Sequence, residues 1–415
     1  MCPRRHAREA ARTYGGRVPI PVTHVGSLVR PDELIAFMRA IDAGQPYDED
    51  AYARCLRDSV RDVVRRQKAA GVDIVSDGEY GKSSWNYYVY RRLAGFELRP
   101  APPVRMQAVT EESRAEDPTI ATDWARFPEF YAQYFAKEQG EFEEPGGIWA
   151  CTSAVRYTGQ AAIERDIRNL RDAMDAEGVA EGFLPVVAPA SCFPTLIDEH
   201  YGSEHAALLG VAEALREEYR AIVDAGLSVQ VDDAFIPFMY DVLVPPGTMQ
   251  DYLDWAAPRI DAVNHALEGI PEDRVRYHVC WGSWNGPHTN DIPLRDVLEL
   301  VFRVRAGTYL FEAANPRHEH EWRVWQDVEL PAGRKIAPGV ISHATNVVEH
   351  PELVAERLER IGRLVGAENL LASTDCGFAQ GPYLQRVHPT IQWAKLEALA
   401  EGAAIASRAL EGAAA

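Results

Sequence analysis

The feature that most constrains the fold is an alternation, from residue 18 onward, between short apolar runs and longer amphipathic segments. This alternation is typical of a parallel sheet whose strands are joined and covered by helices. Nine runs qualify as strands, but an eight-stranded barrel has eight places, so 148–155 or 335–342 is expected outside the ring. The nine runs are 22–28, 72–79, 148–155, 183–191, 227–234, 274–283, 308–314, 335–342 and 369–377.

The segments between these runs place apolar residues three and four positions apart, as amphipathic helices do. The sequence therefore predicts an α/β protein, a (β/α)8 TIM barrel with an inserted helical lid. A chain of 415 residues fits one enlarged barrel over 18–415, preceded by a flexible tail at 1–17. The predicted helices are 50–70, 161–176, 204–225, 248–268, 293–305, 351–365 and 390–411.

The alternation is interrupted at 97–147, where the segment 111–144 holds ten acidic and three basic residues. Aromatic residues are interspersed among these charges, which is unusual for a linker. We expect this insertion to form a helical lid over the barrel mouth. The alternative is a solvated excursion that only covers apolar surface, because long ordered loops are often but not always functional. The aromatic residues are Trp124, Phe127, Phe130, Tyr131, Tyr134 and Phe135.

Charge and composition exclude several classes of partner. The net charge of −19 repels polyphosphates and anionic lipid heads, so nucleic acid is an unsuitable partner. No apolar stretch approaches the roughly 20 residues that span a bilayer, and the basic start lacks the apolar core of a signal peptide. We therefore expect a cytoplasmic protein with no membrane partner. Six cysteines in 415 residues are too sparse for a disulfide framework, so we consider instead whether they bind a metal or act in catalysis.

The strongest chemical signal is the pair His278 and Cys280 in the predicted strand 274–283. Residues two apart on a strand point the same way, and barrel enzymes keep their sites at the carboxyl ends of the strands. Two later strand ends supply Glu312 and Cys376. Sulfur, nitrogen and carboxylate ligands together suit four-coordinate Zn²⁺ better than Mg²⁺ or Ca²⁺. Each residue alone has a simpler interpretation, since a buried Cys is usually a small core residue and a strand His is usually structural.

Other polar residues end the remaining strands at the same mouth. A carboxylate can hold an ammonium group or act as acid or base, and a histidine can carry a proton near neutral pH. Helix capping or turn formation would explain any one of them, whereas their recurrence favours a site. They are His24 and Ser27, Asp77 and Glu79, Asp232 and Asp233, and Ser342 and His343.

Seven phrases occur in the same order as in a known family. They are THVGSLVRP, SDGE, QVDDA, HVCWG, FEAAN, IAPGVISH and STDCGF. Together they resemble the catalytic half of cobalamin-independent methionine synthase and its short relatives, which include epoxyalkane:coenzyme M transferase. The resemblance covers about residues 18–400. It implies a (β/α)8 barrel with a catalytic zinc that activates a thiol towards an alkyl donor.

The resemblance also assigns roles to residues of this sequence. It implies that His278, Cys280, Glu312 and Cys376 hold the zinc. It implies that Glu79 and Asp232 hold the amino group of homocysteine, that Gly26 and Ser27 hold its carboxylate, and that His343 protonates the leaving group of the donor. Trp85 and Tyr87, which follow Glu79 at the barrel mouth, are expected to bind substrate as part of the lid and donor pocket.

Three departures from the family pattern bear on the donor and on one ligand. The full-length synthases carry a second, amino-terminal barrel for which these 415 residues have no room. The phrase QVDDA replaces an aspartate, glutamate, proline run, so the folate contacts do not transfer. The interval between Cys280 and Glu312 is long, which makes Glu319 and Glu321 substitute ligands to check. Cys192 is a further candidate as a stray ligand, while Cys2, Cys55 and Cys151 are expected to be structural or without a role.

The sequence thus favours a zinc-dependent S-alkyltransferase that moves a methyl group, from 5-methyltetrahydrofolate or another donor, to homocysteine or a related thiol. Two alternatives stay open. One is a zinc enzyme of the same barrel family that opens epoxides or hydrolyses a substrate. The other is a non-catalytic carrier of a thiol or a metal. The identity of the donor and the oligomeric state are not determined by the sequence.

Overall fold

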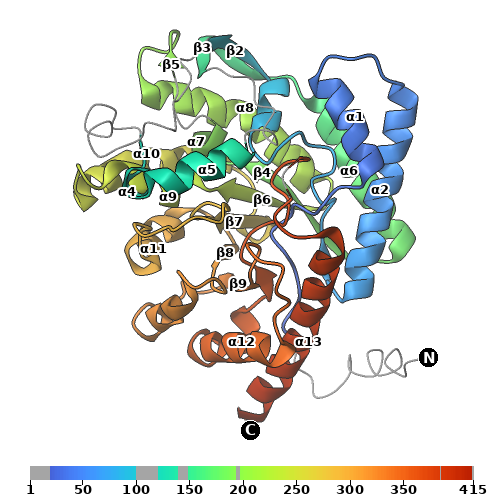
Figure 1. Ribbon diagram of the computed structural model, residues 1–415, viewed down its shortest axis with the longest axis vertical. Helices are drawn as coiled ribbons and strands as arrows, with labels where there is room; N and C mark the ends of the chain where they lie inside the picture. The colour runs from blue at the N-terminus through green and yellow to red at the C-terminus, as the bar shows by residue number, and fades with distance from the viewer. Residues whose placement is uncertain (1–18, 100–119, 139–147, 193–196, 384, 414–415) are drawn as a thin grey trace.

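A computed structural model describes residues 19–99, 120–138, 148–192, 197–383 and 385–413. Its centre is a sheet of seven parallel strands, with hydrogen-bonded neighbours in the order β1-β4-β6-β7-β8-β9-β10 (Figure 1). The strands are β1 (Ile74–Val75), β4 (Glu181–Val187), β6 (Ser228–Asp233), β7 (Val275–Val279), β8 (Thr308–Glu312), β9 (Lys335–Ile341) and β10 (Ser373–Thr374).

The segment around Val22 closes this sheet into a ring. On one side Thr23 N donates to Ala372 O at 2.9 Å, and Ala372 N donates to Pro21 O at 2.8 Å. On the other side Asp73 N and Ile74 N both donate to Val22 O, at 2.9 and 3.1 Å. The eight-membered barrel that the sequence predicts is therefore confirmed, with 20–25 as its first member.

The candidate strand outside the ring is 148–155. It forms β3 (Ile148–Tyr157), which pairs antiparallel with β2 (Leu93–Arg99) and parallel with β5 (Ile197–Asp198). Gly95 has φ +108° at the irregular point of the β2–β3 pairing, where a Cβ would lie 2.9 Å from Ser153 O. The other candidate, 335–342, is β9 of the ring.

Helices cover the outside of the ring, as the periodicity predicts. In α12 (Pro351–Val365), Pro351 occupies the first turn, where its missing N–H costs nothing, and His350 Nδ1 accepts from Glu352 N at 3.3 Å. The buried face of α12 holds Val354, Leu358 and Ile361. The other covering helices are α1 (Asp32–Asp42), α2 (Glu49–Ala70), α6 (Gln160–Glu177), α8 (Glu204–Asp224), α10 (Met249–Ala266), α11 (Leu294–Arg303) and α13 (Pro389–Ala413).

Shorter helices follow the carboxyl ends of several strands or precede the next strand. They are the α-helices α7 (Pro189–Cys192) and α9 (Phe235–Leu243), and the 3-10 helices η3 (Tyr87–Arg91), η5 (Glu272–Arg274), η6 (Glu319–Gln326) and η7 (Ala367–Asn369). Of these, η3, α7, α9 and η6 follow strand ends, so they border the mouth of the barrel.

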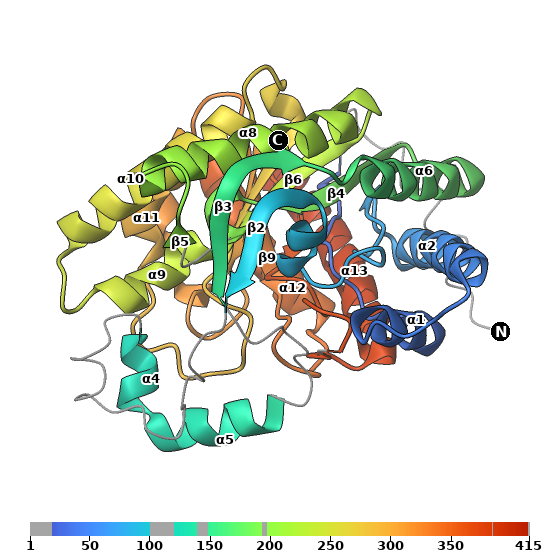
Figure 2. The same cartoon turned by 90° about the horizontal axis from the view of Figure 1, so that it is seen from above.

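The insertion predicted at 97–147 is described in part. Its start continues β2, and two helices follow, α4 (Thr122–Arg126) and α5 (Pro128–Glu138), while 100–119 and 139–147 lie outside the described residues. Figure 2 shows β2 and β3 running side by side, with α4 and α5 together at the edge of the molecule. The tail at 1–17 and Cys2 also lie outside the described residues.

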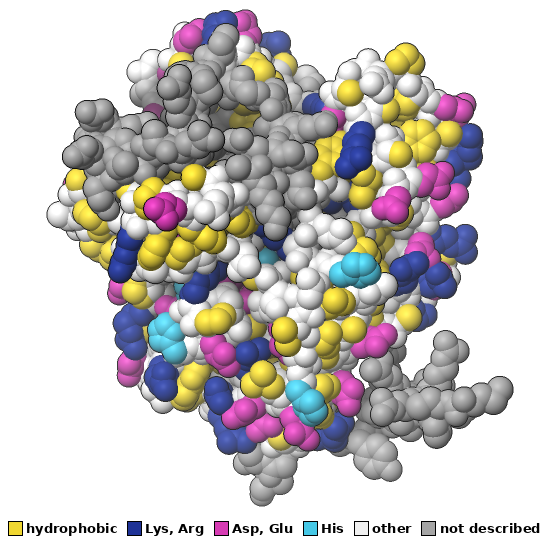
Figure 3. Space-filling view, viewed as in Figure 1, with side chains coloured by type: hydrophobic (Ala, Val, Ile, Leu, Met, Phe, Trp, Pro, Cys, Tyr) yellow, Lys and Arg dark blue, Asp and Glu magenta, His cyan; other side chains and the backbone are white. Residues whose placement is uncertain are grey.

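Charged side chains of both signs are mixed on the visible surface (Figure 3). On the face seen in Figure 3, acidic and basic side chains alternate along the right and lower edges instead of separating into regions of one sign. Within the part of the chain that the structure describes, no helix is both long enough and apolar enough to cross a membrane.

Candidate active site

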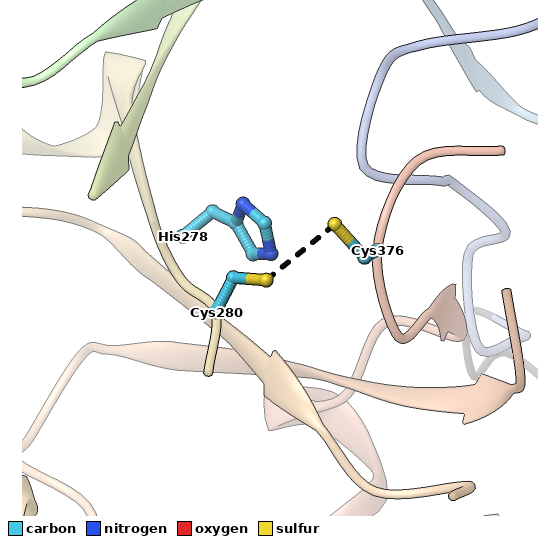
Figure 4. A group of neighbouring side chains, drawn as sticks. All are labelled: His278, Cys280 and Cys376. Carbon is cyan, nitrogen blue, oxygen red and sulfur yellow. Dashed lines mark hydrogen bonds between the residues drawn. The ribbon is translucent and has the colours of Figure 1, made fainter. Parts of the chain in front are cut away.

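His278, Cys280 and Cys376 meet at the carboxyl end of the barrel. His278 and Cys280 project from the end of β7, and Cys376 comes two residues after β10, on the far side of the ring (Figure 4). Their candidate ligand atoms all lie within 4.8 Å of one another, and the two Sγ atoms are 3.6 Å apart. That separation is far longer than a disulfide bond, so both thiols are free and buried.

Asp232 fixes the orientation of His278. Its Oδ1 lies 2.9 Å from His278 Nδ1, and the two residues are register partners on β6 and β7. Burial alone would lower the pKa of His278, but the hydrogen bond and charge of Asp232 outweigh it and raise that pKa. The other ring nitrogen, Nε2, is buried with no hydrogen-bond partner. A carboxylate on one nitrogen and an unoccupied second nitrogen is the arrangement of a metal-ligating histidine.

The two thiols need a positive charge to ionise here. The hydrogen bond with Cys376, followed by burial, raises the pKa of Cys280 well above its usual range. Two adjacent buried thiolates would repel each other, so a cation between them is what would stabilise the ionised pair. The donor set of two sulfurs and one unpartnered imidazole nitrogen therefore fits a zinc ion.

Glu312, the fourth predicted ligand, lies outside the three-residue group. It ends β8 and is buried, but its oxygens are bonded to other groups. Oε1 accepts from Trp281 N at 3.1 Å, and Oε2 accepts from Asn315 Nδ2 at 2.5 Å and from Arg317 Nη2 at 2.9 Å. Arg317 thus neutralises the carboxylate that the resemblance assigns to zinc, and Glu312 as a ligand stays a prediction.

The substitutes for Glu312 are engaged elsewhere. Glu319 pairs with Arg357 at 3.0 Å, and Glu321 accepts from Leu294 N at 2.7 Å at the start of α11. Cys192 Sγ donates to Ala188 O at 3.3 Å. The structure does not bring these three residues into the His278 group.

Glu79 lies on a tight turn beside the metal-ligand candidates. Its φ of +61° is unusual for a residue other than glycine, and such strain often marks a functional position. Arg30 Nη2 holds the turn by donating to Glu79 O at 2.7 Å. Burial is the main cause that raises the pKa of Glu79 to about 7, and its Oε2 is buried without a hydrogen-bond partner. A cationic group of a substrate would supply the missing partner.

Gly26 and Ser27 form a turn that packs against Glu79 and Gly377. A Cβ on Gly26, whose φ is +142°, would lie 2.6 Å from Pro185 Cγ and 3.1 Å from Glu79 Oε1. A Cβ on Gly377 would lie 1.9 Å from Ser27 Oγ. Only glycine fits at either position, and this close packing brings Ser27 next to the residue that follows Cys376.

A cavity of about 1000 Å³ opens above these residues. Its lining includes six residues at or after strand ends, which we call the floor: Ser27, Glu79, Asp232, His278, Cys280 and Cys376. A group of aromatic residues also borders it, and we call these the roof. Trp85 and Tyr87, both predicted, belong to the roof, together with Tyr90, Trp124, Tyr134, Trp149, Phe235, Phe238 and Trp284.

Several roof residues escaped the sequence analysis. Phe235 and Phe238 belong to α9, directly after β6, and Trp284 follows Cys280 by four residues. Trp85 stacks on Phe235 with centroids 6.3 Å apart, and Phe238 meets the edge of Trp284 at 5.5 Å. The sequence could have indicated these residues, because they follow strands that carry site residues and the loops after such strands meet at the barrel mouth.

His343 lies two residues after β9, at the start of the loop that leads to α12, and is buried near Glu312. Burial is the main cause that lowers its pKa to about 4, so the imidazole is neutral near pH 7. Among the described residues, it is not one of those that border the cavity. Its predicted role as a proton donor is untested by this geometry.

Comparisons with known proteins point to one group. Residues 198–390 match the family model described as the catalytic domain of cobalamin-independent synthase. A protein named 2-hydroxypropyl-CoM lyase, from Xanthobacter autotrophicus, is 24% identical over 94% of this chain and 96% of its own length. A protein named methionine synthase, from Thermococcus kodakarensis, is 22% identical over 94% of each chain.

Solved structures share the fold. A B12-independent methionine synthase from Shewanella sp. W3-18-1, in complex with selenomethionine, superimposes with a TM-score of 0.68 at 21% identity, over 95% of this chain and all of the other. A putative vitamin-B12 independent methionine synthase from Listeria monocytogenes gives a TM-score of 0.62 at 18% identity, over 94% of this chain and 98% of the other. The predicted fold class is confirmed.

Proposed function

Because residues 198–390 carry the catalytic domain of the cobalamin-independent synthase family, as the sequence motifs predicted, we propose that this chain is a methyl-transferring enzyme. More specifically, we propose a zinc-dependent S-alkyltransferase that moves a methyl group to homocysteine or a related small thiol. The reduced, buried thiols of the site fit a reducing compartment, which supports a cytoplasmic location.

The observation that carries the proposal is the convergence of Cys280, Cys376 and the unpartnered Nε2 of His278 within 4.8 Å. These three residues would hold the zinc ion, with Glu312 or the substrate thiol completing four ligands. Zinc bound there lowers the pKa of a coordinating thiol and so supplies a thiolate nucleophile near neutral pH.

The protein's own residues then bind and orient the thiol substrate. Glu79 has an unpartnered buried oxygen and would accept from the substrate ammonium group. Ser27, on the turn that packs against Glu79, would donate its hydroxyl to the substrate carboxylate. Asp232 holds His278 in place through Nδ1 and adds a second negative charge near the ammonium group.

In the transfer itself, a bond forms between the substrate sulfur and the alkyl carbon while the bond from that carbon to the donor breaks. A donor that leaves as an anion needs a proton, and His343 is the residue that the family resemblance assigns to this step. The aromatic roof would exclude water, which otherwise competes with the thiolate for the alkyl group.

The roof also bears on the donor. Two arginines border the described part of the cavity: Arg91, whose charge is paired with Asp42 at 2.5 Å, and Arg386, which lies over the ring of Tyr134 at 6.0 Å from its centroid. Flat apolar side chains and phenol hydroxyls therefore dominate the described part of this wall. This composition supports a donor that is small or singly charged rather than one with a long polyanionic tail.

The test is zinc-edge X-ray absorption of the metal-loaded protein with and without homocysteine. We expect the thiol to add one sulfur to the zinc coordination. The Cys55→Ser variant, which alters a free thiol on α2 outside the group, is the matched control and should give the same change. An unchanged coordination shell in both proteins would overturn the proposal.

A second candidate is transfer to coenzyme M or opening of an epoxide by a thiol. It is favoured by the similarity to 2-hydroxypropyl-CoM lyase over 94% of this chain. Competition between homocysteine and 2-mercaptoethanesulfonate separates the two candidates. The methyltransferase should prefer homocysteine, because Glu79 would repel a sulfonate, and a preference for the sulfonate would favour the second candidate.

A further inference from the structure

The side-chain amide of Gln67, on α2, forms hydrogen bonds with both the N–H and the carbonyl of Ser76. Its Oε1 accepts from Ser76 N at 2.9 Å, and its Nε2 donates to Ser76 O at 2.7 Å. Gln67 is fully buried, and its Nε2 also donates to Val63 O within its own helix at 3.2 Å. Ser76 stands between β1 and the turn that carries Glu79.

These two bonds determine which tautomer His24 adopts. A backbone N–H can only donate and a backbone carbonyl can only accept, so the amide oxygen of Gln67 must face Ser76 N. That oxygen also lies 2.7 Å from His24 Nε2. Because the oxygen can only accept, Nε2 of His24 must carry the proton, and Nδ1 must be the bare nitrogen.

The bare nitrogen then holds the other turn of the floor. Gly26 N donates to His24 Nδ1 at 3.2 Å. Ser76 Oγ completes the connection, since it donates to Gly26 O at 3.2 Å and accepts from Gly78 N at 3.0 Å. One glutamine on an outer helix therefore links the turn of Gly26 and Ser27 to the turn of Gly78 and Glu79.

The surroundings of His24 agree with a neutral ring. The group is fully buried, Arg276 Nη2 donates to its carbonyl at 2.9 Å, and Phe183 packs edge-on at 5.6 Å. Burial and the nearby guanidinium both disfavour an imidazolium, so Nδ1 is available as an acceptor at neutral pH. Neither His24 nor Gln67 is among the described residues that border the cavity, so both act through other groups.

We propose that Gln67 and His24 are positioning residues that set the distance between Ser27 and Glu79, the two ends of the site for an amino-acid thiol. The assignment of Ser27 and Glu79 to the substrate rests on the proposed function. The hydrogen-bond relay from Ser76 through Gln67 and His24 to Gly26 rests on the geometry alone.

The first test reads the tautomer directly. A long-range ¹H–¹⁵N spectrum of histidine-labelled protein distinguishes protonated from bare ring nitrogens, and the signal lost in His24→Asn assigns the residue. We expect His24 to be protonated on Nε2 in the parent protein and to lose this single tautomer in Gln67→Met. A proton on Nδ1 in the parent protein would overturn the proposal.

The second test separates positioning from a general loss of stability. Gln67→Met, which keeps the shape but removes the amide and its four hydrogen bonds, should displace the floor turns. The KM for homocysteine should then rise about tenfold, as expected if the substrate loses one hydrogen bond, while zinc content stays the same. The KM for the donor should change less than about threefold. His24→Asn keeps an acceptor near Gly26 N, so its KM for homocysteine should rise less than that of Gln67→Met.

Gln392 provides the matched control. It is a buried glutamine whose Oε1 accepts from Val29 N at 3.0 Å, close in the chain to Ser27 but apart from the relay. Gln392→Met should lower the unfolding temperature without a selective rise in the KM for homocysteine. Equal rises in Gln392→Met and Gln67→Met would overturn the positioning role. If the parent protein transfers no alkyl group to any thiol, the proposed function fails, and the spectrum still decides the relay.

Discussion

The floor and the roof of the cavity are held in place by different interactions. Floor residues sit at strand ends, where buried polar side chains bind backbone groups, as Arg30 binds the Glu79 turn and Gln67 binds Ser76. Roof residues come from η3 and the loop before it, β3, α9, the loop after Cys280 and the inserted helices, and many of them contact one another through aromatic rings. Because the floor depends on buried hydrogen bonds and the roof mainly on ring contacts, mutations should be able to perturb one without the other.

One carboxylate connects the inserted helices to the rest of the roof. Asp123 of α4 is buried and accepts from Tyr131 Oη at 2.6 Å, from His288 N at 2.9 Å and from Thr289 N at 3.0 Å. Tyr131 Oη in turn accepts from Trp284 Nε1 at 3.2 Å. The lid helices are thereby attached to the loop that follows Cys280.

The largest expected effect is on the floor. Changing Cys280 or Cys376 to Ser should strongly reduce bound zinc and abolish transfer. Each change removes one of the two sulfur ligands in the proposed group of three protein ligands. The barrel should stay folded, since its core lies below the site. Metal analysis, circular dichroism and turnover check this, with Cys55→Ser as the control. Full zinc and full turnover in either variant would show that the ligands are assigned wrongly.

The two floor carboxylates should differ from each other. Glu79→Gln should raise the KM for homocysteine by roughly 10-fold to 100-fold, the range for losing a charge-assisted hydrogen bond, and leave zinc content unchanged. Asp232→Asn should also weaken zinc binding, by about 10-fold or more, because Asp232 orients His278. Kinetics and zinc titration measure both changes. If the parent enzyme used homocysteine and a simple alkyl thiol equally, neither carboxylate would serve the ammonium group.

A change in the roof should affect the donor more than the metal. Asp123→Asn places an amide opposite four donor groups, since Thr289 Oγ1 also donates to Asp123 at 2.7 Å. The change should destabilise the protein by about 1–3 kcal/mol, the cost of leaving a buried polar group unpaired. The KM for the donor should rise and zinc content should not. Chemical denaturation and donor kinetics test this, and the exposed Glu129→Gln on α5 should leave both unchanged. A loss of zinc in Asp123→Asn would mean that roof and floor are not separable.

The charge of the insertion predicts how folate donors compare. Donors with one and with three glutamates should be used equally or not at all, because ten acids and three bases at 111–144 repel a long polyanion. Steady-state rates with the two folates measure the preference. A strong preference for the longer tail would contradict the proposed donor pocket.

The smallest expected effect concerns His318, which packs beside the residue that follows Cys280. His318 packs against Trp281, next to Cys280, with ring centroids 4.3 Å apart and the rings tilted by 39°. Burial alone would lower the pKa of His318, but Asp291 and Glu321 raise it to about 9. Because the folded pKa exceeds the unfolded value near 6.5, this stabilisation is complete below about pH 6.5 and is lost as the pH rises through 9.

Denaturation curves between pH 6 and 10 test this pH dependence. The free energy of unfolding should fall with rising pH in the parent protein, and His318→Gln should flatten that fall. An identical slope in both proteins would show that His318 does not carry the charge assigned to it.

The sequence by itself predicted nine strand candidates for an eight-membered barrel, the convergence of His278, Cys280 and Cys376, and the resemblance to the cobalamin-independent synthase family. These follow from hydropathy periods and from the rule that the carboxyl ends of parallel strands meet at one mouth, both of which are local or topological. Tertiary structure decided that 148–155 leaves the ring, that Arg317 neutralises Glu312, and that Phe235, Phe238 and Trp284 complete the roof. It also decided the tautomer of His24 through Gln67. Such pairings depend on distances between elements that are far apart in the chain. Side-chain packing sets these distances, and the periodicity of the sequence does not encode them.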